Sequence, residues 1–247
     1  MTSKQPDPVG QFQADCDREI AAQGQNAELQ DLSRRWFDAS AKAKYSYHFT
    51  WMGRPIIQYP QDMVAMQEVL WRVQPDLIIE TGVAHGGSLV FYASILELIG
   101  KGEVLGIDID IRAHNRAAIE QHPMMKRIRL LQGSSIAPDI ALQARQAASG
   151  KRVLVVLDSN HTHAHVRAEL ELYAPLVSVG SYCIVMDTVV EDLSPDAIFD
   201  RPWAKGDNPK TAVFDYLKGH PEFEIDKGID DKLLLSVAPS GYLRRLP

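Results

Sequence analysis

Apolar residues follow two patterns that alternate from about residue 77 to the end of the chain. Short runs that are apolar throughout are typical of buried parallel strands, and the segments between them repeat their apolar residues at the helical period. Strands are therefore expected at residues 77–79, 102–108, 128–131, 153–157, 182–186, 223–225 and 233–237. Helices are expected at residues 89–98, 112–122, 138–148, 164–176 and 211–217. This order predicts an α/β fold with a doubly wound sheet and helices on both faces.

The N-terminal part of the chain lacks these strand runs. Residues 12–41 carry apolar side chains at helical spacing, which predicts a helical extension. Residues 45–60 are rich in aromatic side chains and broken by glycine and proline, so we expect an irregular segment packed on the domain. Asp62 is expected to cap a helix that leads to the first strand. We divide the chain into an extension (residues 1–60) and an α/β domain (residues 61–247), without internal repeats.

Composition narrows the class of partner. The 247 residues are 45% apolar, enough for one full core, and a net charge of −6 disfavours a nucleic-acid binder. The only cysteines are Cys16 and Cys183, so we expect no disulfide framework and a reducing compartment. Residues 1–15 lack a signal-peptide core, and no apolar run approaches the ~20 residues that a bilayer requires. These features favour a cytoplasmic protein that acts on a small molecule, with no membrane partner.

A glycine-rich turn follows the first strand. Glu80 ends the strand, Gly82 and Gly86 follow, and a helix begins near Ser88. Glycine permits positive φ and close approach to a ligand, while a helix start offers free N–H groups to an anionic group. The spacing is E-x-G-x-x-x-G, not the G-x-G-x-x-G of dinucleotide sites, and it resembles the first motif of class I S-adenosylmethionine (SAM) methyltransferases. Asp108 ends the next strand, where a carboxylate can accept both hydroxyls of a ribose.

Polar residues also follow the later strands. Ser134 and Ser135 come after the third strand, Asp158 after the fourth and Asp187 after the fifth. Ligands of open parallel sheets bind outside the carboxyl ends of the strands, so these side chains are expected at one site with the glycine-rich turn. Taken singly, each has an alternative interpretation as the cap of the following helix.

Five motifs resemble the cephalosporin hydroxylase family, which is related to macrolide and rhamnosyl sugar O-methyltransferases. They are residues 51–58, 80–88, 106–110, 157–163 and 206–211. The resemblance runs from about residue 45 to residue 237 and implies a Rossmann-like class I SAM methyltransferase sheet with SAM as cofactor. The residues that it implies for cofactor binding are Glu80, Gly82 and Ser88 for the methionine moiety, Asp108 for the ribose, and Ser134 or Ser135 for the adenine side. Ala84, His85 and Asp158 are further candidates for cofactor binding, and the alternative for His85 is a structural role in the turn. The substrate is expected over residues 158–163.

Methyl transfer to an alcohol requires a group that removes the hydroxyl proton. His161 follows Asp158 by three residues and is the expected base, as the resemblance also implies. Asp158 and Asp187 end adjacent strands and are placed to share Mg²⁺. Met186 departs from the relatives, which carry a second polar residue at this strand end, and a thioether is a poor ligand for Mg²⁺.

Two readings of this metal site therefore stay open. In one, the two aspartates hold the metal with water and the help of Glu191 or Asp192, and in the other His161 works without a metal. His163 and His165 suggest a zinc site, but alternate histidines share one face only in a strand. Because a loop that enters a helix is expected here, we expect one functional histidine rather than three.

The segment from Glu191 to Thr211 is expected to be a lid, with Arg201 and Trp203 placed to contact a substrate. The alternative is an insertion or an oligomer contact.

The leading hypothesis is a SAM-dependent O-methyltransferase that acts on a hydroxyl of a sugar or another natural product. The alternatives are an enzyme of this fold that catalyses a non-methylating step, and a SAM-binding partner subunit of a hydroxylase system. The N-terminal helices and the aromatic segment are expected to support a homo-oligomer.

Overall fold

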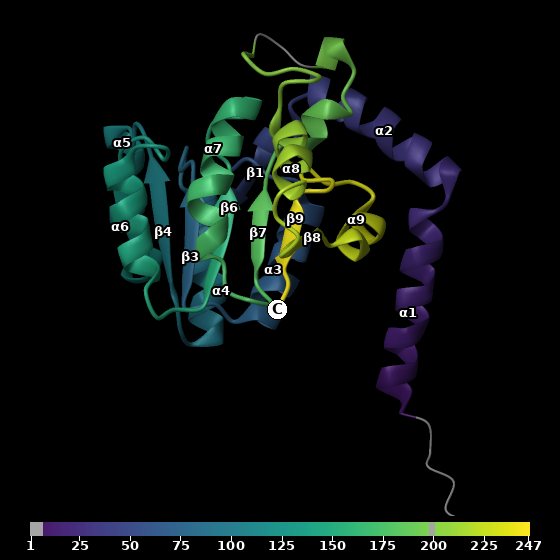
Figure 1. The fold of residues 1–247 in the computed structure, drawn as a ribbon, viewed down its shortest axis with the longest axis horizontal. Coiled ribbons are helices and arrows are strands. Elements are labelled where there is room, and N and C mark those ends of the chain that lie inside the picture. Colours follow the sequence, from purple (N-terminus) through teal and green to yellow (C-terminus); the bar gives the residue numbers. More distant parts are fainter. Residues whose placement is uncertain (1–6, 198–200) are drawn as a thin grey trace, which may run out of the picture.

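A computed structural model of the chain describes residues 7–197 and 201–247. Within these ranges, the centre is a seven-stranded sheet of order β5-β4-β3-β6-β7-β9-β8 (Figure 1). The strands are β3 (Leu77–Thr81), β4 (Glu103–Asp108), β5 (Ile128–Gln132), β6 (Val153–Leu157), β7 (Tyr182–Val185), β8 (Phe223–Ile225) and β9 (Tyr242–Arg245). The five strands from β5 to β7 run parallel, and β9 is antiparallel to both of its neighbours. The predicted α/β fold with a doubly wound sheet is confirmed.

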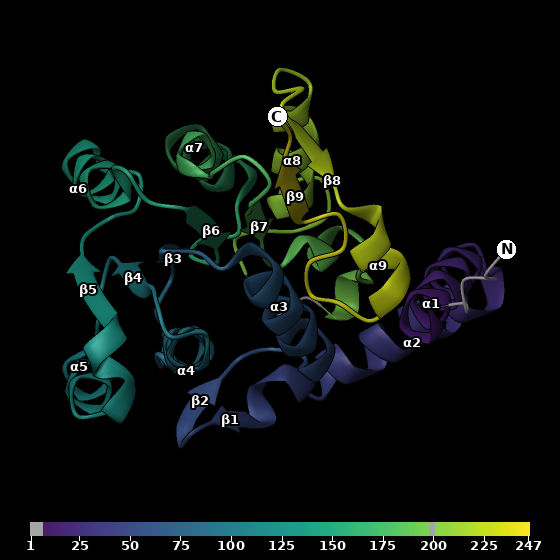
Figure 2. The ribbon, with the colours of Figure 1, turned by 90° about the horizontal axis from the view of Figure 1, so that it is seen from below.

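Helices cover both faces of the sheet (Figure 2). One layer holds α3 (Pro60–Val73), α4 (Gly87–Ile99) and α5 (Ala113–Glu120), and the other holds α6 (Pro138–Ala148), α7 (His163–Tyr173) and α8 (Pro209–Leu217). Every residue of β3 and of β6 is buried, because both faces of these strands are covered by helices. The apolar runs that predicted these strands thus form two cores, one on each side of the sheet.

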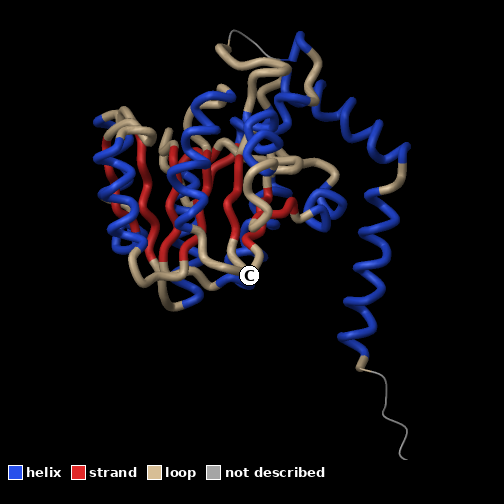
Figure 3. Tube along the Cα trace, viewed as in Figure 1, coloured by secondary structure: helices blue, strands red, loops and turns tan. Residues whose placement is uncertain are grey.

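The strand order reverses between β3 and β6. From β3 the chain adds β4 and β5 on one side, and it then returns to add β6 and β7 on the other. Figure 3 shows the parallel strands side by side, with connecting loops at both ends of the sheet. At such a reversal the loops after the two central strands diverge and leave a crevice for a ligand.

The N-terminal segment consists of α1 (Pro8–Gly24), α2 (Ala27–Lys42), η1 (Tyr45–His48) and a hairpin of β1 (Phe49–Trp51) and β2 (Arg54–Ile56). Helix α1 lies beside α9 (Lys227–Leu233), away from the main sheet, and Gln23 Nε2 donates to the Asp231 carbonyl oxygen at 2.8 Å (Figures 1 and 2). The ring of Trp36 on α2 meets Tyr45 edge-on, with centroids 5.2 Å apart. Trp51 of the hairpin meets Phe91 on α4 at a centroid distance of 4.9 Å, so the aromatic segment packs on the domain as predicted, but most of it is regular and not irregular as expected.

Two local predictions are wrong. Asp62 does not cap α3, because the cap position is Tyr59 and Asp62 lies in the first turn of the helix. Its buried carboxylate instead accepts hydrogen bonds from Ser236 Oγ (2.6 Å) and Val237 N–H (2.9 Å). Residues 233–237 are not a strand but the end of α9 and a loop. In a strand, the Val237 N–H group would donate to a neighbouring strand. Here Asp62 accepts this hydrogen bond instead, so the segment does not need to pair with a strand.

Two expectations drawn from composition can be compared with the structure. Cys16 and Cys183 are both free thiols. No helix within the described ranges is long and apolar enough to cross a membrane.

Candidate functional site

The glycine-rich turn after β3 lies directly against the loop after β6. Gly82 has φ +91°, and a Cβ at this position would overlap the carbonyl oxygen of Asp158, so only glycine fits. Ala84 also has a positive φ of 45°, a conformation that non-glycine residues seldom adopt. Arg54 Nε from the β1/β2 hairpin donates to the carbonyl oxygen of His85 at 3.0 Å. The turn is thus held in a fixed shape before any ligand arrives.

Glu80 is fully buried at the end of β3. Ser88 Oγ donates to Glu80 Oε2 at 2.7 Å, whereas Oε1 has no hydrogen-bond partner among the described residues. Burial raises the pKa of Glu80 to about 8, and the hydroxyl groups of Ser88 and Tyr92 oppose this shift. A cationic group of a ligand would satisfy the second oxygen and favour the ionised carboxylate.

Asp108 joins two of the strand-end loops. Its Oδ2 accepts hydrogen bonds from the N–H groups of Val83 (2.7 Å) and Ala84 (3.3 Å), and its Oδ1 accepts one from Asp110 N–H at 3.0 Å. The carboxylate therefore shapes the glycine-rich turn. Its predicted role toward a ribose stays a prediction.

Asp158, His161 and Asp187 come together at the ends of β6 and β7. Ligand atoms of the three side chains all lie within 4.8 Å of one another, and His161 Nε2 is 3.1 Å from Asp187 Oδ2. Asp187 has φ +55°, which turns the backbone sharply at the end of β7. Sequence reasoning placed these three residues on one rim, and the structure brings them into one cluster.

The cluster carries an excess of negative charge. Burial raises the pKa of Asp158 well above its usual range, and the charges of Asp187, Glu80 and Glu169 raise it further. The two carboxylates, with that excess charge, fit a hard divalent cation such as Mg²⁺ or Mn²⁺, whereas the imidazole is a ligand that Mg²⁺ binds less readily than oxygen. A cation at the cluster would reduce the repulsion and return Asp158 to its ionised form.

The expected additional ligands, Glu191 and Asp192, are engaged elsewhere. Glu191 Oε2 accepts a hydrogen bond from Gly206 N–H at 2.8 Å, and Asp192 Oδ2 pairs with Lys210 Nζ at 2.5 Å. The prediction that they help to hold a metal is wrong, because both stabilise the segment that leads to α8. Met186 is buried, as the sequence suggested, and it supplies no oxygen to the cluster. His161 is the residue that completes the set.

A cavity of about 690 Å³ opens beside the cluster. Its walls come from the glycine-rich turn, the loop after β6, the start of η4 (Thr188–Glu191), the aromatic segment and the segment before α8. The residues already singled out that line it are Gly82, Ala84, His85, Ser88, Asp158, His161, Met186, Asp187, Arg201 and Trp203. The volume suits a ligand of nucleoside size together with part of a second molecule.

Residues 201–203 cover one side of this cavity, where a lid was expected. The Trp203 ring meets the His161 ring edge-on, with centroids 4.7 Å apart. The Arg201 guanidinium lies 5.4 Å from the Trp203 centroid, and it donates to Tyr47 Oη at 3.3 Å. Because the two rings are nearly perpendicular, Trp203 forms an aromatic wall of the cavity beside the imidazole. The predicted segment also includes residues 198–200, which lie outside the described residues.

Ser134 and Ser135 do not line the cavity, and neither do Asp108 and the fully buried Glu80, which reaches the cavity wall through its hydrogen bond from Ser88. Ser135 is buried, and its Oγ lies 3.1 Å from His165 Nε2. His163 Nδ1 lies 2.8 Å from Thr211 Oγ1, at the contact between α7 and α8. His161, His163 and His165 thus have different partners, which agrees with the rejection of a zinc site. The predicted role of Ser134 or Ser135 on the adenine side stays a prediction.

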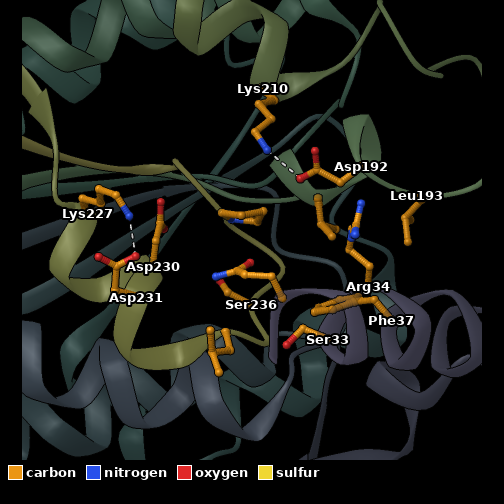
Figure 4. A pocket seen from close by; sticks show the side chains of 14 residues that line it. Ser33, Arg34, Phe37, Asp192, Leu193, Lys210, Lys227, Asp230, Asp231 and Ser236 are labelled. Atoms are coloured by element: carbon orange, nitrogen blue, oxygen red, sulfur yellow. Dashed lines mark hydrogen bonds and ion pairs between the residues drawn. The ribbon is translucent and has the colours of Figure 1, made fainter. Parts of the chain in front are cut away.

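A second cavity, of about 320 Å³, lies between α2, α9 and η4 (Figure 4). Most of its charged groups face one another: Lys210 pairs with Asp192, and Lys227 pairs with Asp231. Burial raises the pKa of Asp230 on the same wall to about 6. Because its ionic groups are already paired, this cavity is the weaker candidate for a reaction site.

Comparison with known proteins agrees with this geometry. Residues 43–246 match the family model described as "Rhamnosyl O-methyltransferase/CmcI". The rhamnosyl O-methyltransferase of Mycobacterium leprae (strain TN) is 32% identical over 201 residues, which cover 79% of this chain and 82% of that protein. The rhamnosyl O-methyltransferase of Mycobacterium tuberculosis (strain ATCC 25618 / H37Rv) is also 32% identical over 201 residues, or 79% of this chain and 78% of the relative.

Solved structures show the same fold at lower identity. A CmcI structure with Mg and SAM superposes with a TM-score of 0.58 at 22% identity, covering 81% of this chain and 78% of the other. A CmcI structure with SAH, S-adenosylhomocysteine, gives a TM-score of 0.52 at 20% identity, covering 80% and 81%. At this identity the likeness concerns the arrangement of the sheet and its helices.

Proposed function

The chain belongs to the rhamnosyl O-methyltransferase/CmcI family, and we propose that it transfers a methyl group from SAM to a hydroxyl of a sugar or a related small molecule. The observation that carries the proposal is the cluster of Asp158, His161 and Asp187 beside a cavity whose other wall is the glycine-rich turn. The turn proposed to bind the cofactor and the residues proposed to act on the acceptor therefore line the same cavity. The relatives are named for rhamnosyl groups, so a deoxysugar hydroxyl is the first acceptor to test.

The glycine-rich turn and Glu80 are the proposed holders of the methionine part of the donor. Glu80 Oε1 is buried without a hydrogen-bond partner among the described residues, as a site for an ammonium group requires. Ser88 fixes the carboxylate through its 2.7 Å hydrogen bond. SAM supplies a methyl group on a positively charged sulfur, and the excess of acidic groups around the cavity favours such a cation.

His161 is the proposed base for the acceptor hydroxyl. When its Nε2–H donates to Asp187 Oδ2, at 3.1 Å, the unprotonated nitrogen is Nδ1, so Nδ1 is the atom that takes the proton. Asp187 orients the ring and stabilises the imidazolium that forms, as carboxylates do for catalytic histidines. Trp203 packs against the imidazole and limits the access of water. The acceptor oxygen is then held in line with the methyl group by the walls of the cavity.

Asp158 and Asp187 are the proposed carboxylate ligands of a divalent cation, with His161 as a third donor in the same cluster. A bound cation would lower the pKa of the acceptor hydroxyl and hold its oxygen in place. In that arrangement His161 exchanges its bond to Asp187 for the metal, so the two roles of His161 are alternatives. Addition of Mg²⁺ or Mn²⁺ to metal-depleted enzyme separates them.

The test is formation of S-adenosylhomocysteine from SAM in the presence of a panel of alcohols led by alkyl rhamnosides and extended to other deoxysugars and macrolide glycosides. Product formation with at least one sugar, lost in Asp187→Ala, supports the proposal. Tight binding of SAM without turnover on any member of the panel would favour a SAM-binding partner subunit or a non-methylating enzyme. The expected homo-oligomer is a separate proposal, which sedimentation analysis of the full chain tests.

A further inference from the structure

A polar cluster on α7 has no part in the chemistry proposed above. His165 Nε2 lies 3.1 Å from Ser135 Oγ, 3.1 Å from Ser159 Oγ and 3.4 Å from Glu169 Oε1. Ser159 Oγ also donates to Glu169 Oε1 at 2.7 Å. Glu169 is completely buried, and its Oε2 has no hydrogen-bond partner in the described part of the chain. His165 and Ser159 are partly exposed, whereas Glu169 and Ser135 are buried, and a buried carboxylate without a full set of partners requires a structural or functional reason.

The two serines come from different loops of the site. Ser135 follows β5, in the loop predicted to lie on the adenine side of the donor. Ser159 follows Asp158 after β6 and lines the main cavity. Tyr173, also on α7, donates its hydroxyl hydrogen to the Ser135 carbonyl oxygen at 2.7 Å. One helix therefore holds the donor-side loop and the reaction-side loop at the same time.

The hydrogen bond from Ser159 to Glu169 fixes the direction of the contacts at His165, whose single Nε2–H is then shared between the hydroxyl oxygens of Ser159 and Ser135. The hydroxyl hydrogen of Ser159 goes to Glu169, so Ser159 Oγ is free to accept from His165 Nε2–H. The buried carboxylate beside it favours a hydrogen on that nitrogen. A nucleophilic serine, histidine and acid triad is excluded, because the serine and the carboxylate both approach Nε2 and no proton can pass from one ring nitrogen to the other.

We infer that His165 is a positioning residue that couples the donor-side loop at Ser135 to the reaction-side loop that carries Asp158 and His161. The inference rests on the proposed function for the identity of the two loops. Binding of the adenine end of the donor would then order the loop that holds the base, through Ser135, His165 and Ser159 in turn. A ligand-free readout keeps the coupling testable even if the donor is a different molecule.

The experiment is hydrogen–deuterium exchange of the ligand-free full chain, with calorimetric titration of S-adenosylhomocysteine alongside. The variants are His165→Leu, which removes the polar nitrogen, His165→Gln, which restores an N–H near the position of Nε2, and Ser135→Ala. The matched control is Arg167→Leu, because Arg167 also lies on α7 but its hydrogen bonds go to Glu171 and to Asp215 on α8.

We expect His165→Leu to raise exchange about tenfold in residues 133–136 and in residues 158–162 together, and to weaken S-adenosylhomocysteine binding about tenfold, the effect of losing about 1.4 kcal/mol. His165→Gln should restore both to within about threefold. Ser135→Ala should raise exchange in residues 158–162, which it does not touch directly. Arg167→Leu should alter neither loop.

Loosening of α7 alone, with both loops unchanged in His165→Leu, would overturn the inference and leave His165 as a purely structural residue. An effect of Ser135→Ala confined to its own loop would also overturn the coupling. Failure of the wild-type chain to bind S-adenosylhomocysteine would instead contradict the proposed function, while the exchange data would still decide the coupling.

Discussion

Glu80 makes donor binding depend on pH in a direction that the structure fixes. The carboxyl group is fully buried, its pKa is about 8, and burial is the main cause of the shift from 4.5. A donor ammonium group that occupies the position beside Oε1 requires the ionised form. Binding at neutral pH should therefore release a proton from Glu80, and donor affinity should rise as the pH approaches 8.

The magnitude follows from the titration curve. With a pKa of about 8, roughly one hundredth of Glu80 is ionised at pH 6, about one tenth at pH 7 and about half at pH 8. If only the ionised form binds the donor, the dissociation constant falls about 50-fold between pH 6 and pH 8. Glu80→Gln cannot ionise, so it lacks this dependence.

The assay is calorimetric titration with S-adenosylhomocysteine at pH 6, 7 and 8, in buffers of different ionisation enthalpy that count the protons released. The α-amino group of the ligand titrates in the same way whichever protein it meets, so the comparison with Glu80→Gln isolates the contribution of Glu80. Equal pH slopes and equal proton counts in the two proteins would refute the reasoning.

Three other perturbations test separate parts of the site. His161→Ala should lower kcat by roughly 100-fold or more and leave S-adenosylhomocysteine affinity nearly unchanged, since a general base acts on the acceptor; an unchanged kcat would remove it from the mechanism. Asp187→Asn should abolish any stimulation by Mg²⁺ after chelation, and stimulation equal to wild type would show that the cation binds elsewhere. Gly82→Ala should weaken donor binding by at least tenfold or prevent folding, because its Cβ would overlap the Asp158 carbonyl; wild-type affinity and melting temperature would contradict that reading. Glu80→Gln should also raise stability relative to wild type at pH 9, because a carboxyl group with a raised folded pKa contributes stability below about 4.5 and loses it as the pH rises through about 8.

The sheet was predictable because its strands are buried on both faces. Runs such as residues 77–79 and 153–157 are apolar throughout, and only a strand covered by two helix layers fits such a short run. The run at residues 233–237 is apolar except for Ser236, yet it forms the end of α9 and a loop. Its backbone is satisfied by Asp62, which is 175 residues away from Val237 in sequence, and no local pattern reveals such a partner.

The sequence predicted which strand ends form the site, but it did not predict the contacts between individual side chains. The position of acids after successive parallel strands placed Asp158 and Asp187 at one edge of the sheet, and the cluster follows from that geometry. Glu191 and Asp192 were assigned to the metal because they are close in sequence, whereas they pair with residues 206–210. The partners of His165 were missed, because a hydrogen-bond cluster between two loops and a helix leaves no spacing signal.

The most direct test of the central claim is titration calorimetry of the purified chain with SAM and with S-adenosylhomocysteine, each with and without Mg²⁺. Micromolar binding of both molecules is expected, together with proton release that disappears in Glu80→Gln. Absence of binding to either molecule, in both metal conditions, would contradict the assignment of this site to a methyl donor.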